Sequence, residues 1–265
     1  MQQNLLSKII HSSEPNSNPN PFNNFSFDFK VVLVFLYVPL CLTIVHYFGS
    51  FDFLQDNLNA IGVNRISRLL SRIYTSSNNL GQLAYWFTIL FIFYFLVPVL
   101  MIKFIFKDKL SDFGLKFRGA FKDYYLYLII LGVMIPLVLF FSRTQSFQSR
   151  YPFLHFEKGA SLFPDLLIWE IMYCIQFFVI EFFFRGFVLF GLQSKLGVYS
   201  VFIMTIPYCM VHFGKPMPET IAAIIAGVVL GFLSLKNRSV YLGCLIHITV
   251  GLSMDIASLW HKGYL

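Results

Sequence analysis

Apolar stretches long enough to cross a lipid bilayer dominate this sequence. A transmembrane helix needs about 20 consecutive, mainly apolar residues, and seven stretches come close to that length. They lie at residues 31–50, 82–102, 124–142, 164–192, 196–213, 219–235 and 238–259. Over the whole chain 57% of the residues are hydrophobic and only 12% are charged, which is far from the composition of a soluble protein. The sequence therefore predicts an all-α fold, a polytopic membrane bundle of about seven helices.

The chain divides into three predicted parts. Residues 1–30 are polar and rich in Asn, Ser and Pro, and they are interpreted as a disordered tail. Residues 31–163 hold the first spans, their basic loops and an amphipathic segment with Arg65, Arg68 and Arg72 at helical spacing. This segment is predicted to lie flat in the lipid headgroup region, as an interfacial anchor. Residues 164–260 hold the polar side chains that point to a function.

The excess of Lys and Arg, +7 over the chain, is interpreted as a sign of loop topology and anionic lipid contact. The lipid bilayer is therefore an expected partner, and nucleic acid is not. The densest basic segment, residues 103–122, is predicted to be cytoplasmic, which places the N-terminus inside and the C-terminus outside. An Asn-, Phe- and Ile-rich composition with a polar tail would suit a multi-pass protein of a bacterial inner membrane.

Within Leu166–Leu192 of the fourth apolar stretch, charged residues stand at three positions, Glu170, Glu181 and Arg185. Each ionised residue near the centre of a span costs about 2.5 to 3.5 kcal/mol, so such residues normally have a partner or a function. Glu181 and Arg185 are one helical turn apart, which predicts a charge-assisted contact between them. Glu170 is about 16 Å from Glu181 along a helix axis. Glu170 is therefore interpreted as a rim or structural acid.

Two histidines lie in other apolar stretches. His212 precedes a turn at residues 213–216, and His247 lies in the middle of the last stretch. Taken alone, each histidine also has a structural interpretation. His212 could cap its helix or donate to a backbone carbonyl, and His247 could form a hydrogen bond to a neighbouring helix. One carboxylate and two imidazoles on three different membrane helices favour a buried catalytic centre instead. The predicted catalytic residues are Glu181, His212, His247 and Arg185.

Two chemical interpretations of this centre stay open. Glu181, His212 and His247 could bind zinc or another divalent metal that lowers the pKa of a bound water. Without a metal, Glu181 could act as the general base while a histidine orients the water or stabilises the oxyanion. Both versions hydrolyse an acyl bond. The chain has neither an H-E-x-x-H pair nor a G-x-S-x-G elbow, so a soluble-type zinc protease or a serine hydrolase is not supported.

Three motifs carry a resemblance to a known family. Glu-Phe-Phe-Phe-Arg-Gly at residues 181–186, Pro-Tyr-Cys-Met-Val-His-Phe-Gly-Lys-Pro at residues 207–216 and the late His247 resemble, in order and spacing, the motifs of the CPBP family. That family comprises the type II CAAX prenyl endopeptidases, lysostaphin-resistance-like proteins and bacteriocin-processing or immunity proteins. The resemblance covers residues 164–260 and implies a helical intramembrane endopeptidase of the metal-dependent or glutamate type. It places the family's motif residues on Glu181, Arg185, His212 and His247.

The sequence departs from the family pattern at two positions. Ile180 stands where the family has the first glutamate of a pair, the one usually given the water-activating role. Gly251 stands four residues after the last histidine, where Asn is frequent. Glu181 is then expected to take over from Ile180, although a helical step of about 100° separates the two side chains. Asp255 is a candidate replacement for the missing Asn.

The resulting prediction is an intramembrane endopeptidase that hydrolyses a membrane-proximal or lipophilic peptide by glutamate- and histidine-activated water. Its expected partner is a membrane-associated peptide or protein substrate. The alternative is a non-catalytic membrane module of the same fold, an immunity protein or a peptide-binding scaffold. Intact Glu181, His212 and His247 favour the enzyme, whereas Ile180 and Gly251 favour the binder. A proton-coupled transporter would also use such residues, but the sequence shows no matching half-chains.

Overall fold

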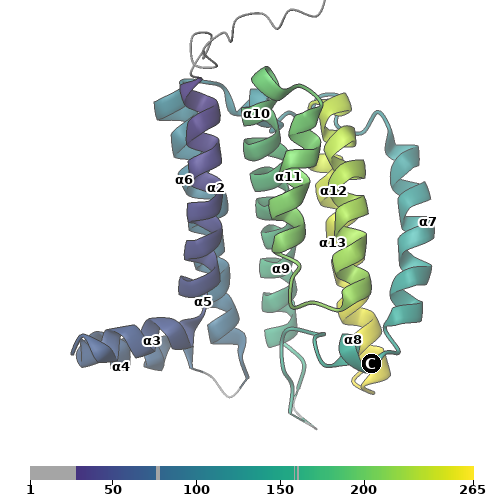
Figure 1. Cartoon of the computed structure of the whole chain (residues 1–265). Helices are drawn as coiled ribbons and strands as arrows, with labels where there is room; N and C mark the ends of the chain where they lie inside the picture. Colours follow the sequence, from purple (N-terminus) through teal and green to yellow (C-terminus); the bar gives the residue numbers. More distant parts are fainter. Residues whose placement is uncertain (1–27, 76–77, 158, 160) are drawn as a thin grey trace, which may run out of the picture.

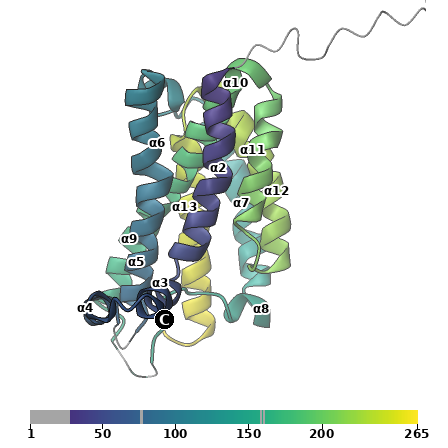
Figure 2. The ribbon, with the colours of Figure 1, turned by 60° about the vertical axis from the view of Figure 1, so that its left-hand side comes forward.

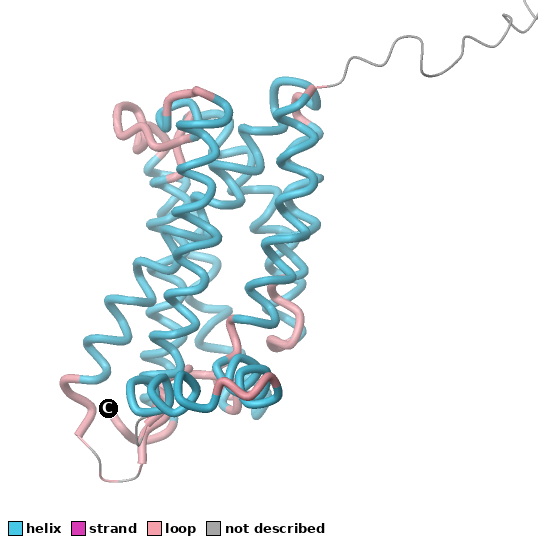
Figure 3. The backbone as a smooth tube through the Cα atoms, turned by 90° about the vertical axis from the view of Figure 1, so that its left-hand side faces the viewer, coloured by secondary structure: helices cyan, strands magenta, loops and turns pink. Residues whose placement is uncertain are grey.

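The computed structural model describes residues 28–75, 78–157, 159 and 161–265. Helices are the only regular elements in these residues (Figure 3). Those of the first half are α2 (Phe29–Phe48), α3 (Phe51–Ala60), α4 (Asn64–Tyr74), α5 (Leu80–Phe91), η1 (Ile92–Leu96), α6 (Val97–Leu100), η2 (Met101–Phe106) and η3 (Leu110–Phe113). Those of the second half are α7 (Tyr124–Phe141), α8 (Gln145–Gln148), α9 (Asp165–Glu181), η4 (Phe182–Val188), α10 (Leu189–Leu196), α11 (Tyr199–Met210), α12 (Met217–Asn237) and α13 (Tyr241–His261). The predicted all-α fold is confirmed.

Six helical segments among the described residues are long and apolar enough to cross a bilayer. They are Phe29–Phe48, Leu80–Phe106, Tyr124–Phe141, Asp165–Leu196, Met217–Asn237 and Tyr241–His261. Their axes run side by side in the bundle (Figure 1). The fifth predicted stretch, 196–213, instead gives the 12-residue helix α11. Gly197, with a φ of 52°, separates α11 from α10. The last residue of α11 is Met210, so the helix ends before His212. The chain is thus a multi-pass membrane protein with a seventh, shorter apolar helix.

The long helix that carries the charged residues is not regular throughout. It is α-helical from Asp165 to Glu181, has a π-helical segment from Phe182 to Val188, and returns to α-helix up to Leu196. A π-helical turn changes the direction in which the following side chains point, and such turns are frequent at functional sites. Glu181 is the last α-helical residue before this change.

Aromatic side chains fill the centre of the bundle around this π-helical segment. Phe182, Phe183, Phe184 and Phe187 are fully buried. The ring of Phe183 stacks on Tyr94 of η1, with 4.4 Å between the ring centres and 7° between the planes. This packing joins the second span to the fourth and fixes the level of the charged residues within the membrane.

Helices α11 and α12 approach each other closely where Gly227 and Gly231 of α12, four residues apart, face α11. A Cβ atom on Gly227 would lie 2.7 Å from Cγ2 of Thr205, and one on Gly231 would lie 2.8 Å from Cγ1 of Val201. Side chains at these two positions would therefore clash with α11. The close approach holds the turn that carries His212 against the rest of the bundle.

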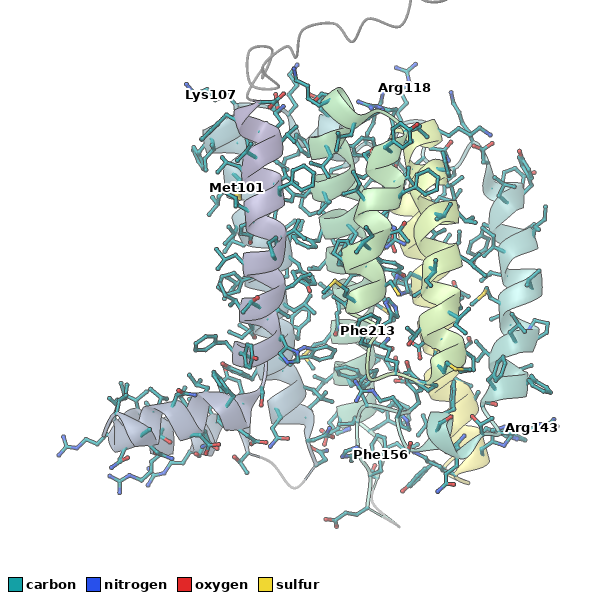
Figure 4. The ribbon with its side chains drawn as sticks, viewed as in Figure 1. Met101, Lys107, Arg118, Arg143, Phe156 and Phe213 are labelled. Atoms are coloured by element: carbon teal, nitrogen blue, oxygen red, sulfur yellow. The ribbon has the colours of Figure 1, made fainter. Side chains whose placement is uncertain are left out.

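Helices α3 and α4 form an arm that leaves the end of α2 at a steep angle and projects sideways, away from the bundle, near one of its ends (Figures 1 and 2). Ile66, Leu69 and Ile73 of α4 are exposed, as expected for a helix with an apolar face toward lipid. The opposite end of the bundle carries Lys107 and Arg118 (Figure 4). The interfacial role of this segment stays a prediction. Residues 1–27 of the predicted disordered tail lie outside the residues that the structure describes.

Candidate functional site

Glu181 is the centre of a buried polar chain. Its side chain has no solvent-exposed area. Its Oε1 atom accepts a hydrogen bond from Nδ1 of His247, 2.9 Å away, and forms an ion pair with Nη1 of Arg185 at 3.1 Å. The structure thus contains the predicted contact of Glu181 with Arg185, and it adds a contact between α9 and α13 that links the carboxylate to one of the two histidines.

Arg185 is also fully buried, and three groups surround its guanidinium. The Cζ atom lies 3.7 Å from the centre of the Tyr208 ring, which is a cation–π distance. Nη2 donates to the backbone oxygen of Ala226 at 3.4 Å, and Nη1 faces Glu181. Two opposite charges removed from water stabilise each other only while both are present. Arg185 is therefore the charge partner of the Glu181 carboxylate inside the bundle.

Gly243 of α13 leaves room for the second carboxylate oxygen. A Cβ atom at this position would lie 2.9 Å from Oε2 of Glu181. Oε2 itself is buried and has no hydrogen-bond partner among the described residues. The packing of α13 against the carboxylate therefore depends on a residue without a side chain.

Both histidines present one ring nitrogen for chemistry. Nδ1 of His247 donates to Glu181, and the ring packs on Phe177 with 4.4 Å between ring centres. Nδ1 of His212 donates to the backbone oxygen of Tyr208 at 2.8 Å. Because both acceptors require a proton on Nδ1, a neutral imidazole at either position has its lone pair on Nε2. The two side chains come from different parts of the chain and line one cavity.

This cavity has a volume of about 620 Å³. It lies between α2 and α5 on one side and α9, α13 and the turn after α11 on the other. Phe213 of that turn lies within the height of the bundle, above the level of the arm (Figure 4). The cavity therefore reaches the two imidazoles at a depth that lipid surrounds.

Polar side chains gather where the cavity meets the loop before α9. Arg150 and Lys215 line it there, and the Arg150 guanidinium lies 4.9 Å from the centre of the Phe153 ring. Lys215 pairs with Oε1 of Glu219 at 2.7 Å, and the Tyr151 hydroxyl donates to Oε2 at 2.6 Å. Burial of the phenol raises the pKa of Tyr151, so this hydroxyl keeps the proton that it donates.

Ile180 faces the cavity, whereas Glu181 does not. Ile180 lines the cavity together with both histidines, and Glu181 lies behind His247. The helical step of about 100° between neighbouring residues accounts for this difference. Glu181 therefore does not replace the side chain at position 180, and it reaches the cavity only through the imidazole of His247.

Gly251 makes room for an aromatic ring. A Cβ atom at this position would lie only 2.3 Å from Cε2 and Cζ of Phe177. The Phe177 ring thus lies beside the Gly251 backbone as well as against His247. Asp255 is not part of the cavity lining, since its Oδ2 accepts a hydrogen bond from Nε1 of Trp169 at 3.1 Å and both side chains are fully buried. Asp255 is therefore a packing partner of Trp169 in this structure.

Two residues that the sequence analysis did not select also belong to the site. Gln176 lies one helical turn before Ile180 and lines the cavity, and Phe177 stacks on His247. A signal for Gln176 exists in the sequence, because it is an amide within an apolar stretch at the same helical spacing from Ile180 as Arg185 from Glu181. Glu170, by contrast, is not among the residues that line the cavity.

The predicted metal ligands do not form a ready-made ligand set. Within the described ranges, no group of three or more His, Cys, Asp or Glu side chains is arranged to hold a metal ion. Oε1 of Glu181 already bonds Arg185 and His247, and the Nδ1 atoms of both histidines are engaged. Binding by Glu181, His212 and His247 would require Glu181 to exchange these partners. The metal stays a prediction, and the hydrolytic step can be derived from the side chains alone.

Residues 162–253 match the model of a protein family described as Rce1-like, type II CAAX prenyl endopeptidase. The matched residues run from the loop before α9 into α13 and include all four predicted site residues. The comparisons with curated proteins and with solved structures give no match. The family match and the three motifs therefore fall on the same helices of the chain. Residues 162–253 are therefore similar to the Rce1-like type II CAAX prenyl endopeptidases, in agreement with the resemblance of the three motifs to the CPBP family of intramembrane proteases.

Proposed function

We propose that the chain is an intramembrane endopeptidase that hydrolyses a membrane-proximal or lipophilic peptide with a water molecule activated by His247 and Glu181. The observation that carries the proposal is the buried chain from Arg185 through Glu181 to His247, which ends in the cavity. A carboxylate that accepts from Nδ1 fixes the tautomer and makes Nε2 a stronger base. Glu181 is then a positioning residue, and His247 is the general base.

The proposed step moves one proton in and out of His247. Nε2 of His247 takes a proton from water, and the water oxygen attacks the carbonyl carbon of the peptide bond. The C–N bond of the tetrahedral intermediate then breaks, and the leaving amine takes the proton back from Nε2. Glu181 stabilises the imidazolium through Nδ1 while the proton resides there.

His212 has a second role in this proposal. Because its Nδ1 donates to the Tyr208 carbonyl, its Nε2 can accept a hydrogen bond from the other O–H group of the attacking water. A water held between two acceptors has its oxygen lone pair directed at the substrate, and this orientation contributes to the rate of attack. Zinc or another divalent ion on Glu181, His212 and His247 stays an untested prediction, and a bacterial inner membrane stays the proposed location.

Isotope incorporation tests the proposed hydrolysis directly. Membranes that contain the protein are incubated in H₂¹⁸O, and new C-termini are identified by mass spectrometry. We expect each new carboxylate to carry one ¹⁸O atom with the wild type, and we expect His247→Gln to lower their yield by about 10² to 10⁴, the usual contribution of a general base. His261→Gln removes an imidazole from the end of the same helix, where it contacts Ser142, and should behave like the wild type.

Equal yields of labelled termini from the wild type and His247→Gln, with both proteins folded, would contradict the proposed role of His247. The second candidate function, a peptide-binding module without catalysis, is favoured by one observation. Ile180 and the Phe177 ring present apolar surface to the cavity where the family pattern has an acid and an amide. A wild type that retains peptides and produces no labelled termini would support this candidate.

A further inference from the structure

We infer that Gln176 is a substrate-binding residue, whose side-chain amide pairs with the N–H and C=O of one residue of an extended peptide in the cavity. This inference rests on the proposed function in taking a peptide as the occupant of the cavity, but it does not require that the peptide is cleaved. Neither the family match nor the three motifs assign a role to this position.

The side chain of Gln176 is buried without being satisfied. Only 3% of the residue is exposed, and it lines the cavity together with Ile180 and the two histidines. Its Oε1 atom has no hydrogen-bond partner anywhere in the part of the chain that the structure describes. A buried polar group without a partner is destabilising, because it has lost its hydrogen bonds to water. A ligand that supplies the missing hydrogen bonds therefore recovers free energy that the empty site lacks.

A peptide backbone fits the chemistry of this group. A primary amide both donates and accepts, and the N–H and C=O of one residue in an extended chain point to the same side, where a partner can exchange both hydrogen bonds with them. Much of the neighbouring cavity wall is aromatic, including Trp86, Phe153 and Phe177. These side chains compete little with Gln176 for hydrogen bonds to the peptide N–H and C=O groups. Because the contact uses only backbone atoms, it would accept many substrate sequences.

The position of Gln176 agrees with a role in placing the peptide. It precedes Ile180 by four residues, which is about 6 Å along the helix axis. Helix α9 begins at the end of the bundle that carries the arm (Figure 1), so Gln176 lies on the side of Ile180 nearer to that end. A peptide that enters from the region of Arg150 passes Gln176 before it reaches the histidines. Pairing at Gln176 would then hold the following peptide bonds near His212 and His247.

A binding experiment with matched probes tests this inference. The full chain in nanodiscs is equilibrated with a pool of N-myristoylated, apolar hexapeptides, and with a second pool in which esters replace the three central amides and remove their N–H groups. We expect the wild type to retain the amide pool at least about tenfold better than the ester pool, the effect of one or two hydrogen bonds to a buried group. Gln176→Met should lower retention of the amide pool to that of the ester pool.

Stability separates this role from a structural one. Because Gln176→Met removes an unpaired buried amide and keeps the side-chain length, we expect an unchanged or higher melting temperature. Gln193→Met is the matched control, since Gln193 lies on α10 and bonds Arg238 away from the cavity. It should retain both pools as the wild type does. A lower melting temperature of Gln176→Met, with both pools lost equally, would show a structural role and overturn the inference.

Two other results would also overturn it: no peptide retained by the wild type, or equal retention of the amide pool by the wild type and Gln176→Met. The proposed catalysis fails in a different way, which the isotope experiment detects. Peptide retention that depends on Gln176, without ¹⁸O in any new terminus, would support this inference and contradict the proposed hydrolysis. Labelled termini, together with peptide retention that does not depend on Gln176, would support the proposed hydrolysis and contradict the role inferred for Gln176.

Discussion

Glu181→Gln alone is expected to lower the free energy of unfolding by about 3 to 5 kcal/mol, the cost of leaving one charge of a buried ion pair without its partner. The guanidinium of Arg185 is fully buried, and Glu181 is the carboxylate that it contacts. Arg185→Met should be destabilising for the converse reason, because it leaves the carboxylate buried beside His247 alone. Denaturant unfolding in detergent micelles, followed by circular dichroism, measures both losses.

The double variant Glu181→Gln/Arg185→Met should recover most of that loss. Replacing both members of a buried ion pair by neutral side chains of similar volume is often neutral or stabilising. Lys236→Met is the matched control, because Lys236 pairs with Asp123 but its side chain is 60% exposed, and it should lower the free energy of unfolding far less than either single change in the buried pair. A double variant that loses the sum of the two single losses would contradict the account of Arg185 as the charge partner of Glu181.

Gly251→Ala is expected to destabilise the protein by about 1 to 3 kcal/mol, the usual cost of forcing an extra group into a packed core. Its Cβ atom would lie 2.3 Å from the Phe177 ring, and that ring is held between Tyr173 and His247. The ring must therefore move away from its contact with His247. Thermal unfolding of the purified variant in micelles measures the loss.

Gly132→Ala supplies the control for this prediction. A Cβ atom at Gly132 meets no other atom within 4 Å, so this change should be neutral or stabilise α7 by up to about 1 kcal/mol. Combining Gly251→Ala with Phe177→Ala should cost at least about 1 kcal/mol less than the sum of the single losses, because the two residues compete for one space. Strictly additive losses would show that the Phe177 ring does not depend on Gly251.

The positions of the spans follow from the sequence because length and hydrophobicity alone decide whether a helix can cross the bilayer. The ion pair of Glu181 with Arg185 is equally local, since one helical turn brings the two side chains together. The length of the fifth span was not predictable in the same way. The apolar stretch continues to Phe213, but Gly197 and the turn before Pro216 limit α11 to 12 residues.

The direction of each side chain could not be read from the sequence. Whether Ile180 or Glu181 faces the cavity depends on where α2, α5 and α13 lie around α9, and these contacts join residues far apart in the chain. The hydrogen bond between Glu181 and His247 spans 66 residues. The sequence analysis gave Glu181 the role of a base in direct contact with water, whereas the geometry leads us to propose His247 for that role. Gln176 was missed for the same reason.

The most direct test of the central claim is a comparison of new protein termini in cells. Cells that express the wild type, the double variant Glu181→Gln/Arg185→Met or His212→Ala at matched levels are analysed by proteomics of membrane-protein termini. We expect new termini with the wild type that disappear with both variants, although both variants remain folded in the membrane. Identical termini in all three strains, with every protein folded, would contradict catalysis by this site and leave peptide binding as its function.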